Sequence, residues 1–308
     1  MKDVYAIAEI SAQAHQQEQK RELIRSKEVD ELVEQVDLIR EDHPGCGLEK
    51  LYRTLQPTCM GRDKFIQVLM SLGYRVRKIK NYRRTTISGT VYYPNLIEGM
   101  LITAKNQVWE TDITYLEHGN RFYYLTMIID VFSRVIVGYE VADHLRAEAN
   151  LNALNMAVKA NPNNLKGLIH HSDRGSQYTS SAYLAVLDKM GIVPSMGSIA
   201  IENAYAERVN GTIKNEYLKH WKSDTFNELK RNVKRAINHY NRKRLHNSLG
   251  KKMTPMMVAC QSLSLTNPQR PTVTIYAEGK PKIREVSNLS DFNPQKDLWA
   301  PICPMVTN

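Results

Sequence analysis

Cysteines, long apolar runs and internal repeats are scarce or absent in this chain of 308 residues. The four cysteines, Cys46, Cys59, Cys260 and Cys303, are scattered without a C-x-x-C pair, which disfavours both a disulfide framework and a zinc finger. No stretch approaches the roughly 18 consecutive apolar residues of a membrane span, and the first residues show no signal-peptide pattern. No fixed-period repeat is present, which excludes solenoid and collagen-like classes. We therefore expect a soluble, cytoplasmic protein that has no membrane partner.

The charge distribution predicts a polyanionic partner. Lys and Arg number 42 against 32 Asp and Glu, a net charge of +10. Residues 208–252 alone carry 13 basic and three acidic side chains, which accounts for the whole excess. A smaller basic cluster consists of Arg75, Arg77, Lys78, Lys80, Arg83 and Arg84. A charge run is usually a solvated helix face, but the near absence of interleaved acids here favours a surface that binds nucleic-acid phosphates.

The N-terminal region has the pattern of three helices. Apolar residues at helical spacing predict an amphipathic helix over 17–42, which ends before His43-Pro44-Gly45. Two short helical patterns follow, at 48–55 and 62–72, separated by a proline turn, and together they are typical of a helix-turn-helix. The adjacent basic cluster favours DNA binding by this motif. The resulting boundaries are 1–43 for the helical region, 44–84 for the helix-turn-helix and 85–104 for a linker.

From residue 106 the pattern changes to that of an α/β fold. Three segments rich in β-branched and aromatic residues, at 108–116, 122–132 and 134–142, predict sequential antiparallel strands. Two further short strands at 165–171 and 192–196 alternate with helices at about 146–160 and 180–190. This order indicates a mixed five-stranded sheet with flanking helices. The basic excess falls on two more predicted helices, about 203–220 and 225–242.

Three carboxylates on separate elements are candidates for a metal site. Asp112 lies inside a strand that is otherwise built for burial, where an unpaired carboxylate is costly. Asp173 directly follows an apolar strand, at the edge of the sheet where ligands bind, although it is equally suited to a turn. Glu207 lies on a predicted helix and shares a face with Asn203 and Lys214. Oxygen ligands of this kind suit Mg²⁺ or Mn²⁺ in phosphoryl transfer.

Two other sites are less well supported by the residues. His170 and His171 could ligate zinc, but neither a cysteine partner nor an H-E-x-x-H motif accompanies them, which favours a structural or DNA-contacting role. Ser172 lies beside His171 and Asp173 like part of a hydrolase triad, yet the G-x-S-x-G elbow is missing.

Five ordered motifs over about 150 residues carry a resemblance to a known family. They are WETDITYL, IIDVFSRVIVGYEV, LIHHSDRGSQYTS, NAYAERVNGTIKNEYL and HYNRKRLHNSLGKKMTP. They resemble the integrase-like core of bacterial insertion-sequence transposases, specifically the OrfB proteins of the IS-three family. The helix-turn-helix segment extends the resemblance to roughly residues 35–256.

The resemblance implies a ribonuclease H-like fold and a DDE triad that cuts and joins DNA with two Mg²⁺ ions, for which Mn²⁺ could substitute. Asp112 matches the first Asp, Asp173 the second and Glu207 the Glu, so these residues are the expected catalytic and metal-binding set. Lys214 matches a basic position that holds the transposon end. The further DNA-contact candidates are Asn203, Arg174, Gln177, Arg208, Arg242, Arg244, His246, Arg75, Arg77 and Lys78.

The sequence departs from the family pattern at three points. The spacing between Asp173 and Glu207 is slightly short, and Glu202 stands where the family usually has Asp, which makes Glu202 a rival third carboxylate. Its position before the helix favours Glu207 instead. The catalytic core is expected over 105–256, and the tail over 257–308 has no assigned role. Family members are often made as a fusion to an upstream OrfA, and no obvious OrfA begins this chain.

The expected function is therefore a DNA transposase that cleaves and joins element ends, with DNA as substrate. Because two ends must be brought together, we expect at least a homodimer, with OrfA as a further partner or fusion. Two alternatives stay open: a DNA-binding regulator or inactive remnant, and a ribonuclease H-like nuclease. The helix-turn-helix disfavours the nuclease, since cutting hybrids needs no reader of duplex sequence.

Overall fold

The computed structural model describes residues 12–76, 92–118, 121–162, 165–197, 200–250, 252–261 and 273–274. The chain divides into two compact units, Met1–Lys78 and Ile79–Asn308. Across the described residues, every helix is too short or too polar to span a bilayer.

Within residues 12–76, the described part of the first unit, three helices form a cluster, as the sequence predicts. It consists of α2 (Ala12–Asp42), α3 (Leu48–Leu55) and α4 (Arg62–Ser71). Its core joins Leu32 and Val36 of α2 to Leu51, Phe65 and Leu69 of the two short helices. The long helix begins at Ala12, earlier than the expected residue 17, and its buried residues all lie in the C-terminal half. The helix-turn-helix and the second half of α2 therefore share one hydrophobic core.

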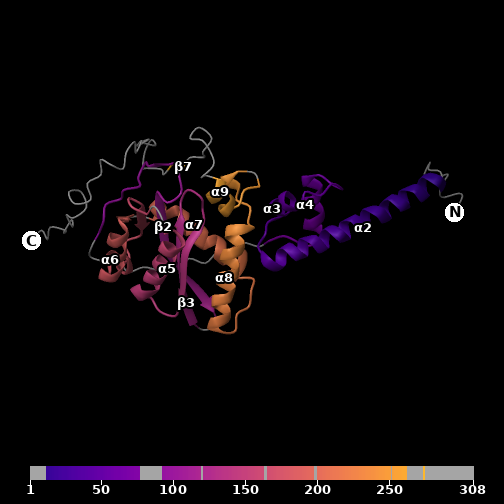
Figure 1. The fold of residues 1–308 in the computed structure, drawn as a ribbon. Helices are drawn as coiled ribbons and strands as arrows, with labels where there is room; N and C mark the ends of the chain where they lie inside the picture. The colour runs from indigo at the N-terminus through magenta and orange to yellow at the C-terminus, as the bar shows by residue number, and fades with distance from the viewer. Residues whose placement is uncertain are drawn as a thin grey trace, which may run out of the picture. The chain divides into compact units, whose positions relative to one another are not determined.

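The second unit is built on the expected mixed five-stranded sheet (Figure 1). Its strands are β2 (Val108–His118), β3 (Arg121–Asp130), β4 (Ile136–Ala142), β5 (Ile169–Ser172) and β6 (Val193–Met196). The spatial order is β4-β3-β2-β5-β6, with β2, β3 and β4 antiparallel and β5 and β6 parallel to β2. This arrangement brings β2 next to β5, which lies about 50 residues later in the chain.

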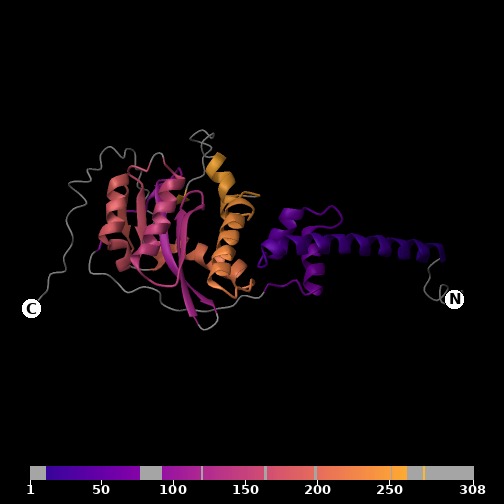
Figure 2. The same ribbon diagram turned by 60° about the horizontal axis from the view of Figure 1, so that its bottom comes forward.

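Helices cover both faces of this sheet (Figure 2). One face packs against α5 (Ala147–Ala160) and α6 (Ser181–Met190), and the other against α7 (Ala204–Ile213) and α8 (Phe226–Arg242). The side chains of β2 alternate between the two faces, because Trp109 and Ile113 enter the core beneath α5 and α6 whereas Leu116 packs on the α7 side. Glu110, Asp112 and Thr114 therefore point toward α7.

Several strand boundaries differ from the sequence prediction by one to four residues, and two of the differences have clear local reasons. β3 ends at Asp130 instead of 132, because the buried Asp130 carboxylate accepts hydrogen bonds from the Ser133 amide at 2.7 Å and hydroxyl at 2.6 Å. This turn ends the strand two residues early. β5 begins at Ile169 instead of 165, because the preceding residues form a turn in which Gly167 has a φ of +82°.

The helix expected over 203–220 also changes character along its length. It is α-helical to Ile213 and continues as a π-helix over Lys214–Leu218. Beyond α8, a short 3₁₀ helix (Asn247–Leu249) leads to α9 (Pro255–Gln261). In the tail, β7 (Val273–Thr274) pairs antiparallel with β1 (Leu101–Ile102), which lies just ahead of the main sheet.

Candidate active site

The register of two neighbouring strands places Asp112 beside Asp173. Glu110 of β2 pairs with His171 of β5 in the parallel ladder. Asp112 and Asp173 each lie two residues farther along, so they are at matching positions where β5 has just ended. Successive residues of a strand alternate between faces, which places Asp112 on the α7 side of the sheet, and Asp173 lies in the turn that follows β5. Two carboxylates separated by about 60 residues in the sequence thus share one edge of the sheet.

Asp112 is held in a fixed orientation by two donors. The Asn210 side-chain amide of α7 donates to Oδ2 at 2.8 Å, and the Ile113 backbone amide donates to Oδ1 at 2.9 Å. Burial, followed by the negative charges of Asp173 and Glu207, raises the pKa of Asp112 to about 7. The two donors only partly offset this rise. The site therefore brings negative charges close together, and a bound cation would reduce the repulsion between them.

Asp173 lies in a tight turn that its own carboxylate closes. Its Oδ1 accepts a hydrogen bond from the Gly175 amide at 3.0 Å. Gly175 has a φ of −68° and a ψ of 134°, an extended conformation open to any residue, so the hydrogen bond defines this turn. The turn role that the sequence left open for Asp173 therefore exists, and it also fixes the carboxylate beside Asp112.

The placement of α7 brings Glu207 near this site. The buried Glu110 carboxylate accepts hydrogen bonds from the Tyr205 amide at 2.9 Å and the Ala206 amide at 3.0 Å, at the first turn of α7. Burial raises the pKa of Glu110 to about 7. Asn203 donates to the Thr111 carbonyl at 2.8 Å. These contacts tie the start of α7 to β2, and they leave the side chain of Glu207 exposed.

Lys214 lies two turns beyond Glu207, on the side of the helix that faces β2. Its ammonium group is 3.3 Å from the Thr114 hydroxyl. Burial and the nearby positive charge of Lys219 lower the pKa of Lys214, while Asp112 and Glu117 act in the opposite direction. Asn210 and Lys214 are one helical turn apart, so both side chains lie over the same stretch of β2. Asn210 was missed by the sequence reasoning, although it shares the face of Asn203 and Lys214.

Some of the residues that the sequence predicts to contact DNA are exposed to solvent in the structure, and others are buried. Arg75, Arg174, Arg208 and Arg242 are exposed, and Lys214 and His246 are partly exposed. Asn203, Gln177 and Arg244 are buried. Arg244 makes a two-pronged ion pair with Glu216, at 2.7 Å for each hydrogen bond. Arg77 and Lys78 lie outside the described residues.

The two rival sites are occupied by structural contacts. His170 lies 2.6 Å from the Tyr183 hydroxyl and His171 lies 2.8 Å from the Ser195 hydroxyl. Burial lowers the pKa of His170 to about 3 and that of His171 to about 4, so both rings are neutral at pH 7. The Ser172 hydroxyl donates to the adjacent Asp173 carbonyl at 2.8 Å. These groups support the end of β5 and do not form a hydrolase triad.

Glu202, the rival third carboxylate, faces a different partner. It lies in the 3₁₀ helix Ala200–Asn203, and its charge acts on His171, where it raises the pKa against the larger effect of burial. The carboxylates that act on Asp112 are Asp173 and Glu207. This difference favours Glu207 over Glu202 as the third carboxylate of the site. Among the described residues, three His, Cys, Asp or Glu side chains do not converge closely enough to form a ready metal site.

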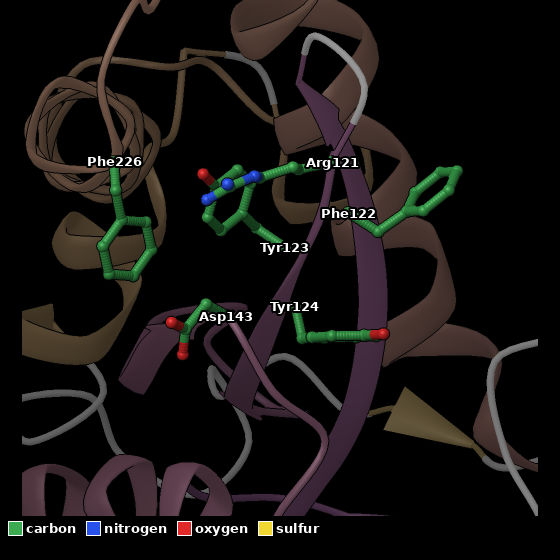
Figure 3. Close-up of a pocket in the computed structure, with 6 residues that line it drawn as sticks. All are labelled: Arg121, Phe122, Tyr123, Tyr124, Asp143 and Phe226. Atoms are coloured by element: carbon green, nitrogen blue, oxygen red, sulfur yellow. The ribbon is translucent and has the colours of Figure 1, made fainter.

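A separate pocket of about 450 Å³ lies at the far end of the β2–β3 hairpin (Figure 3). Arg121 and Tyr123 point toward Phe226 of α8, and Phe122 points away from them. Tyr123 and Phe226 stack on each other with ring centroids 4.9 Å apart. The residues that line this pocket do not include any of the candidate carboxylates Asp112, Asp173 and Glu207.

Comparison with known proteins decides the family. The family described as "Integrase core domain" matches residues 102–200, and a second family of the same description matches residues 195–255. The putative transposase for insertion sequence element IS986/IS6110 of Mycobacterium tuberculosis is 31% identical over 71% of this chain and 84% of its own length. The transposase for insertion sequence element IS904 of Lactococcus lactis is 33% identical over 71% of this chain and 89% of its own length. The chain belongs to the insertion-sequence transposases with an integrase core.

This membership identifies the activity. The transposase is a DDE-type polynucleotidyl transferase that acts on DNA, and the residues matched by the two integrase core families, 102–255, lie within the second compact unit. Among solved structures, the HTLV-2 integrase catalytic core domain, in a structure described as a complex with magnesium, is 22% identical and has a TM-score of 0.41. The match covers 50% of this transposase and 97% of that chain.

Proposed function

We propose that Asp112, Asp173 and Glu207 form the DDE triad with which this transposase cleaves and joins insertion-element ends. The observation that carries the proposal is the placement of Asp173 beside Asp112, with Glu207 near both: after burial, the negative charges of these two carboxylates raise the pKa of Asp112. A cluster of carboxylates is suited to binding a cation. The basic residues of the adjacent segment 208–252 are suited to binding nucleic-acid phosphates.

The donors present fit a hard divalent cation. All three are carboxylates, which are the ligands that Mg²⁺ and Mn²⁺ prefer, and nitrogen and sulfur ligands are not among them. Two Mg²⁺ ions held there would activate the attacking oxygen and stabilise the leaving oxygen in phosphoryl transfer. The proposal requires the exposed Glu207 side chain to turn toward the two aspartates, since the three groups do not converge as described.

The chain's own residues supply orientation and DNA binding in this proposal. Asn210 and the Gly175 amide orient the two aspartates. Lys214 holds a phosphate of the element end, and the exposed Arg174, Arg208 and Arg242 extend the contact surface. Arg174 lies over the ring of Tyr92, with its guanidinium carbon 4.6 Å from the ring centroid. The buried Asn203, Gln177 and Arg244 are left out, because a contact with DNA would require them to leave their present partners.

The helix-turn-helix unit is assigned to duplex binding. Arg75 is exposed directly after α4 and would contact the backbone there. Homodimerisation and a partnership with an upstream OrfA remain part of the proposal, because cutting two element ends together requires two catalytic cores.

The test is a cleavage and strand-transfer assay on labelled duplexes that carry candidate element ends, with Mg²⁺ and with EDTA. Asp112→Asn, Asp173→Asn and Glu207→Gln are expected to lower cleavage by roughly three orders of magnitude, because the two-metal arrangement supplies several kcal/mol. DNA binding by the same variants should stay close to that of the wild type.

Glu202→Gln is the matched control. It removes a carboxylate from the turn before α7 without touching the Asp112 group, so its cleavage is expected to stay near wild type. Normal cleavage by Glu207→Gln together with loss in Glu202→Gln would reassign the third carboxylate. DNA binding without products from the wild type, with OrfA also supplied, would instead indicate a regulator or an inactive remnant.

A further inference from the structure

The buried ion pair between Arg244 and Glu216 connects the basic segment after α8 to the helix of the active site. Arg244 donates through Nε and Nη2 to the two carboxylate oxygens of Glu216, both at 2.7 Å. The side chains are 8% and 21% exposed. The guanidinium also lies 5.6 Å from the ring centroid of Tyr240. A two-pronged pair of this kind fixes both distance and orientation.

Glu216 lies within the π-helix that begins at Lys214. The Lys219 amide donates to the Lys214 carbonyl at 3.0 Å, a bond that spans five residues. Side chains two positions apart on a helix point to nearly opposite sides. Lys214 accordingly reaches Thr114 on β2, while Glu216 reaches Arg244 on the other side. The π-helix is held from both sides at once.

This arrangement sets the rotation of the helix about its own axis. Asn210, one turn before Lys214, donates to Asp112, so any rotation moves the orienting donor of Asp112 and the Lys214 ammonium together. Tyr217, the neighbour of Glu216, adds a second link through its hydroxyl, 3.0 Å from Nδ1 of His239 on α8. The ion pair is therefore placed to control the geometry of Lys214 from outside the active site.

We propose that Arg244 is a positioning residue, which acts through Glu216 to hold Lys214 in place for an anionic phosphate of the DNA end. The inference rests on the proposed function, in which Lys214 contacts DNA, and it replaces the direct DNA contact that the sequence predicts for Arg244. The charge pattern of the sequence does not reveal this role. Arg244 is counted among the basic residues of 208–252, but its side chain is buried against Glu216.

The first measurement needs no DNA. Lysine acetylation rates of the full chain are followed by mass spectrometry for wild type, Glu216→Gln and Arg244→Gln. Both variants are expected to acetylate Lys214 several times faster than wild type, because the half-buried ammonium loses its fixed position, while the exposed Lys234 serves as the internal reference. Glu140→Gln is the matched control: it removes an ion pair with Lys230, at 3.6 Å on the surface of the same unit.

The second measurement is the salt dependence of binding to a DNA end. Lys214→Ala is expected to reduce the slope of log K against log salt by about 0.9, the value for one phosphate contact on duplex DNA. Glu216→Gln and Arg244→Gln should each produce a similar loss, and adding Lys214→Ala to either should change little further. Arg244→Lys, which keeps the charge and part of the hydrogen bonding, should restore a share of the slope.

The outcomes separate the possibilities. If Arg244 touched DNA directly, Arg244→Gln would lower the slope whereas Glu216→Gln, which leaves the arginine cation in place, would not; that result overturns the proposal. Lower thermal stability with unchanged Lys214 acetylation also overturns it, because the pair would then serve packing alone. Suppose that Lys214 is acetylated faster in both variants but Lys214→Ala leaves the salt slope of DNA binding unchanged. That result would support the positioning role of Arg244 and contradict the proposed DNA contact of Lys214.

Discussion

Gly138 marks the closest approach between the sheet and the helix that covers it. A Cβ at this position would lie 2.2 Å from the Ala153 carbonyl oxygen and 2.9 Å from the Cβ of Ala157, both on α5. Backbone cannot yield as a flexible side chain does, so a methyl group here would push α5 away from β4. The small residues on both sides of this contact allow the two elements to meet.

Gly138→Ala is therefore expected to lower the free energy of unfolding of the second unit, Ile79–Asn308, by about 1–3 kcal/mol, the usual cost of overpacking. This unit contains the integrase core and is named the catalytic unit. Urea unfolding followed by tryptophan fluorescence measures the loss, because Trp109 and Trp221 both lie in this unit and residues 1–78 contain no tryptophan.

Gly211→Ala is the matched control for that substitution. Gly211 lies inside α7, where an added Cβ meets only the Asn215 side chain at 3.9 Å. Alanine should stabilise the helix by up to about 1 kcal/mol relative to glycine. Equal losses of stability in the two variants would show that the contact with α5 is not the cause of the loss at Gly138.

Individual residues differ in how far the sequence could reveal their roles. Asp112 and Asp173 could be selected as candidates from the residues alone because a carboxylate in or directly after an apolar strand is physically unusual. The exposed Glu207 depended on the motif, since a helical glutamate has no such signature. Arg244 was predicted as a DNA contact because a basic run does not reveal which of its members finds a buried carboxylate, and only the tertiary structure brings Glu216 to it.

At the scale of elements, α8 shows how local sequence starts a helix. Thr225 accepts a hydrogen bond from the Glu228 amide at 3.2 Å, and the Glu228 carboxylate accepts one from the Thr225 amide at 3.3 Å. This reciprocal pair satisfies two backbone donors that a helix start leaves without partners. The same helix then carries the exposed basic residues on one face and Leu229, Val233 and Ile237 on the buried face.

Thr225→Ala is expected to lower the free energy of unfolding of the catalytic unit by about 1 kcal/mol, through loss of the capping bond. Thr212→Ala, whose hydroxyl donates to the Arg208 carbonyl within a helix, should change stability much less, because the helix already satisfies that carbonyl. Urea midpoints of the two variants, measured by the same fluorescence change, give the comparison. A loss as large in Thr212→Ala would contradict the capping explanation.

Element order and type could be predicted well, since both depend on the spacing of apolar residues. The five strands, their sequence and the helices between them follow from that spacing alone. The ends of elements could not be predicted in the same way. β3 ends where the Asp130 carboxylate accepts a hydrogen bond from the Ser133 backbone amide. The amino-acid composition around Lys214 gives no sign of the π-helix that begins there. Such features depend on contacts between a side chain and one particular backbone group.

In the catalytic unit as a whole, the candidate carboxylates and the basic excess lie in neighbouring segments. Asp112 and Asp173 lie at the edge of the sheet, Glu207 lies on α7, and the basic excess begins on the same helix and extends over residues 208–252. Native interactions do not neutralise the carboxylates fully, so the folded protein stores electrostatic free energy at this edge. Active sites commonly accept such a cost in stability.

This stored repulsion makes the response to metal removal predictable. In EDTA, Asp112→Asn is expected to raise the free energy of unfolding of the catalytic unit by about 1 kcal/mol, because it removes one of three like charges and the new amide oxygen can still accept the Asn210 hydrogen bond. In Mg²⁺ the order should reverse. A ligand that binds only the folded state stabilises wild type by about 2.7 kcal/mol at 100 times its dissociation constant, and the variant loses most of that gain.

Urea unfolding of both proteins in EDTA and in a series of Mg²⁺ concentrations measures this crossover without any DNA or turnover. Glu202→Gln again serves as the control and should follow wild type in both conditions, since Glu202 acts on His171 instead of on Asp112. Two parallel stability curves for wild type and Asp112→Asn would mean that Asp112 binds no metal. A crossover would mean that the same charges that destabilise the empty site provide its affinity for the cation, and hence that catalysis and stability are opposed at this edge of the sheet.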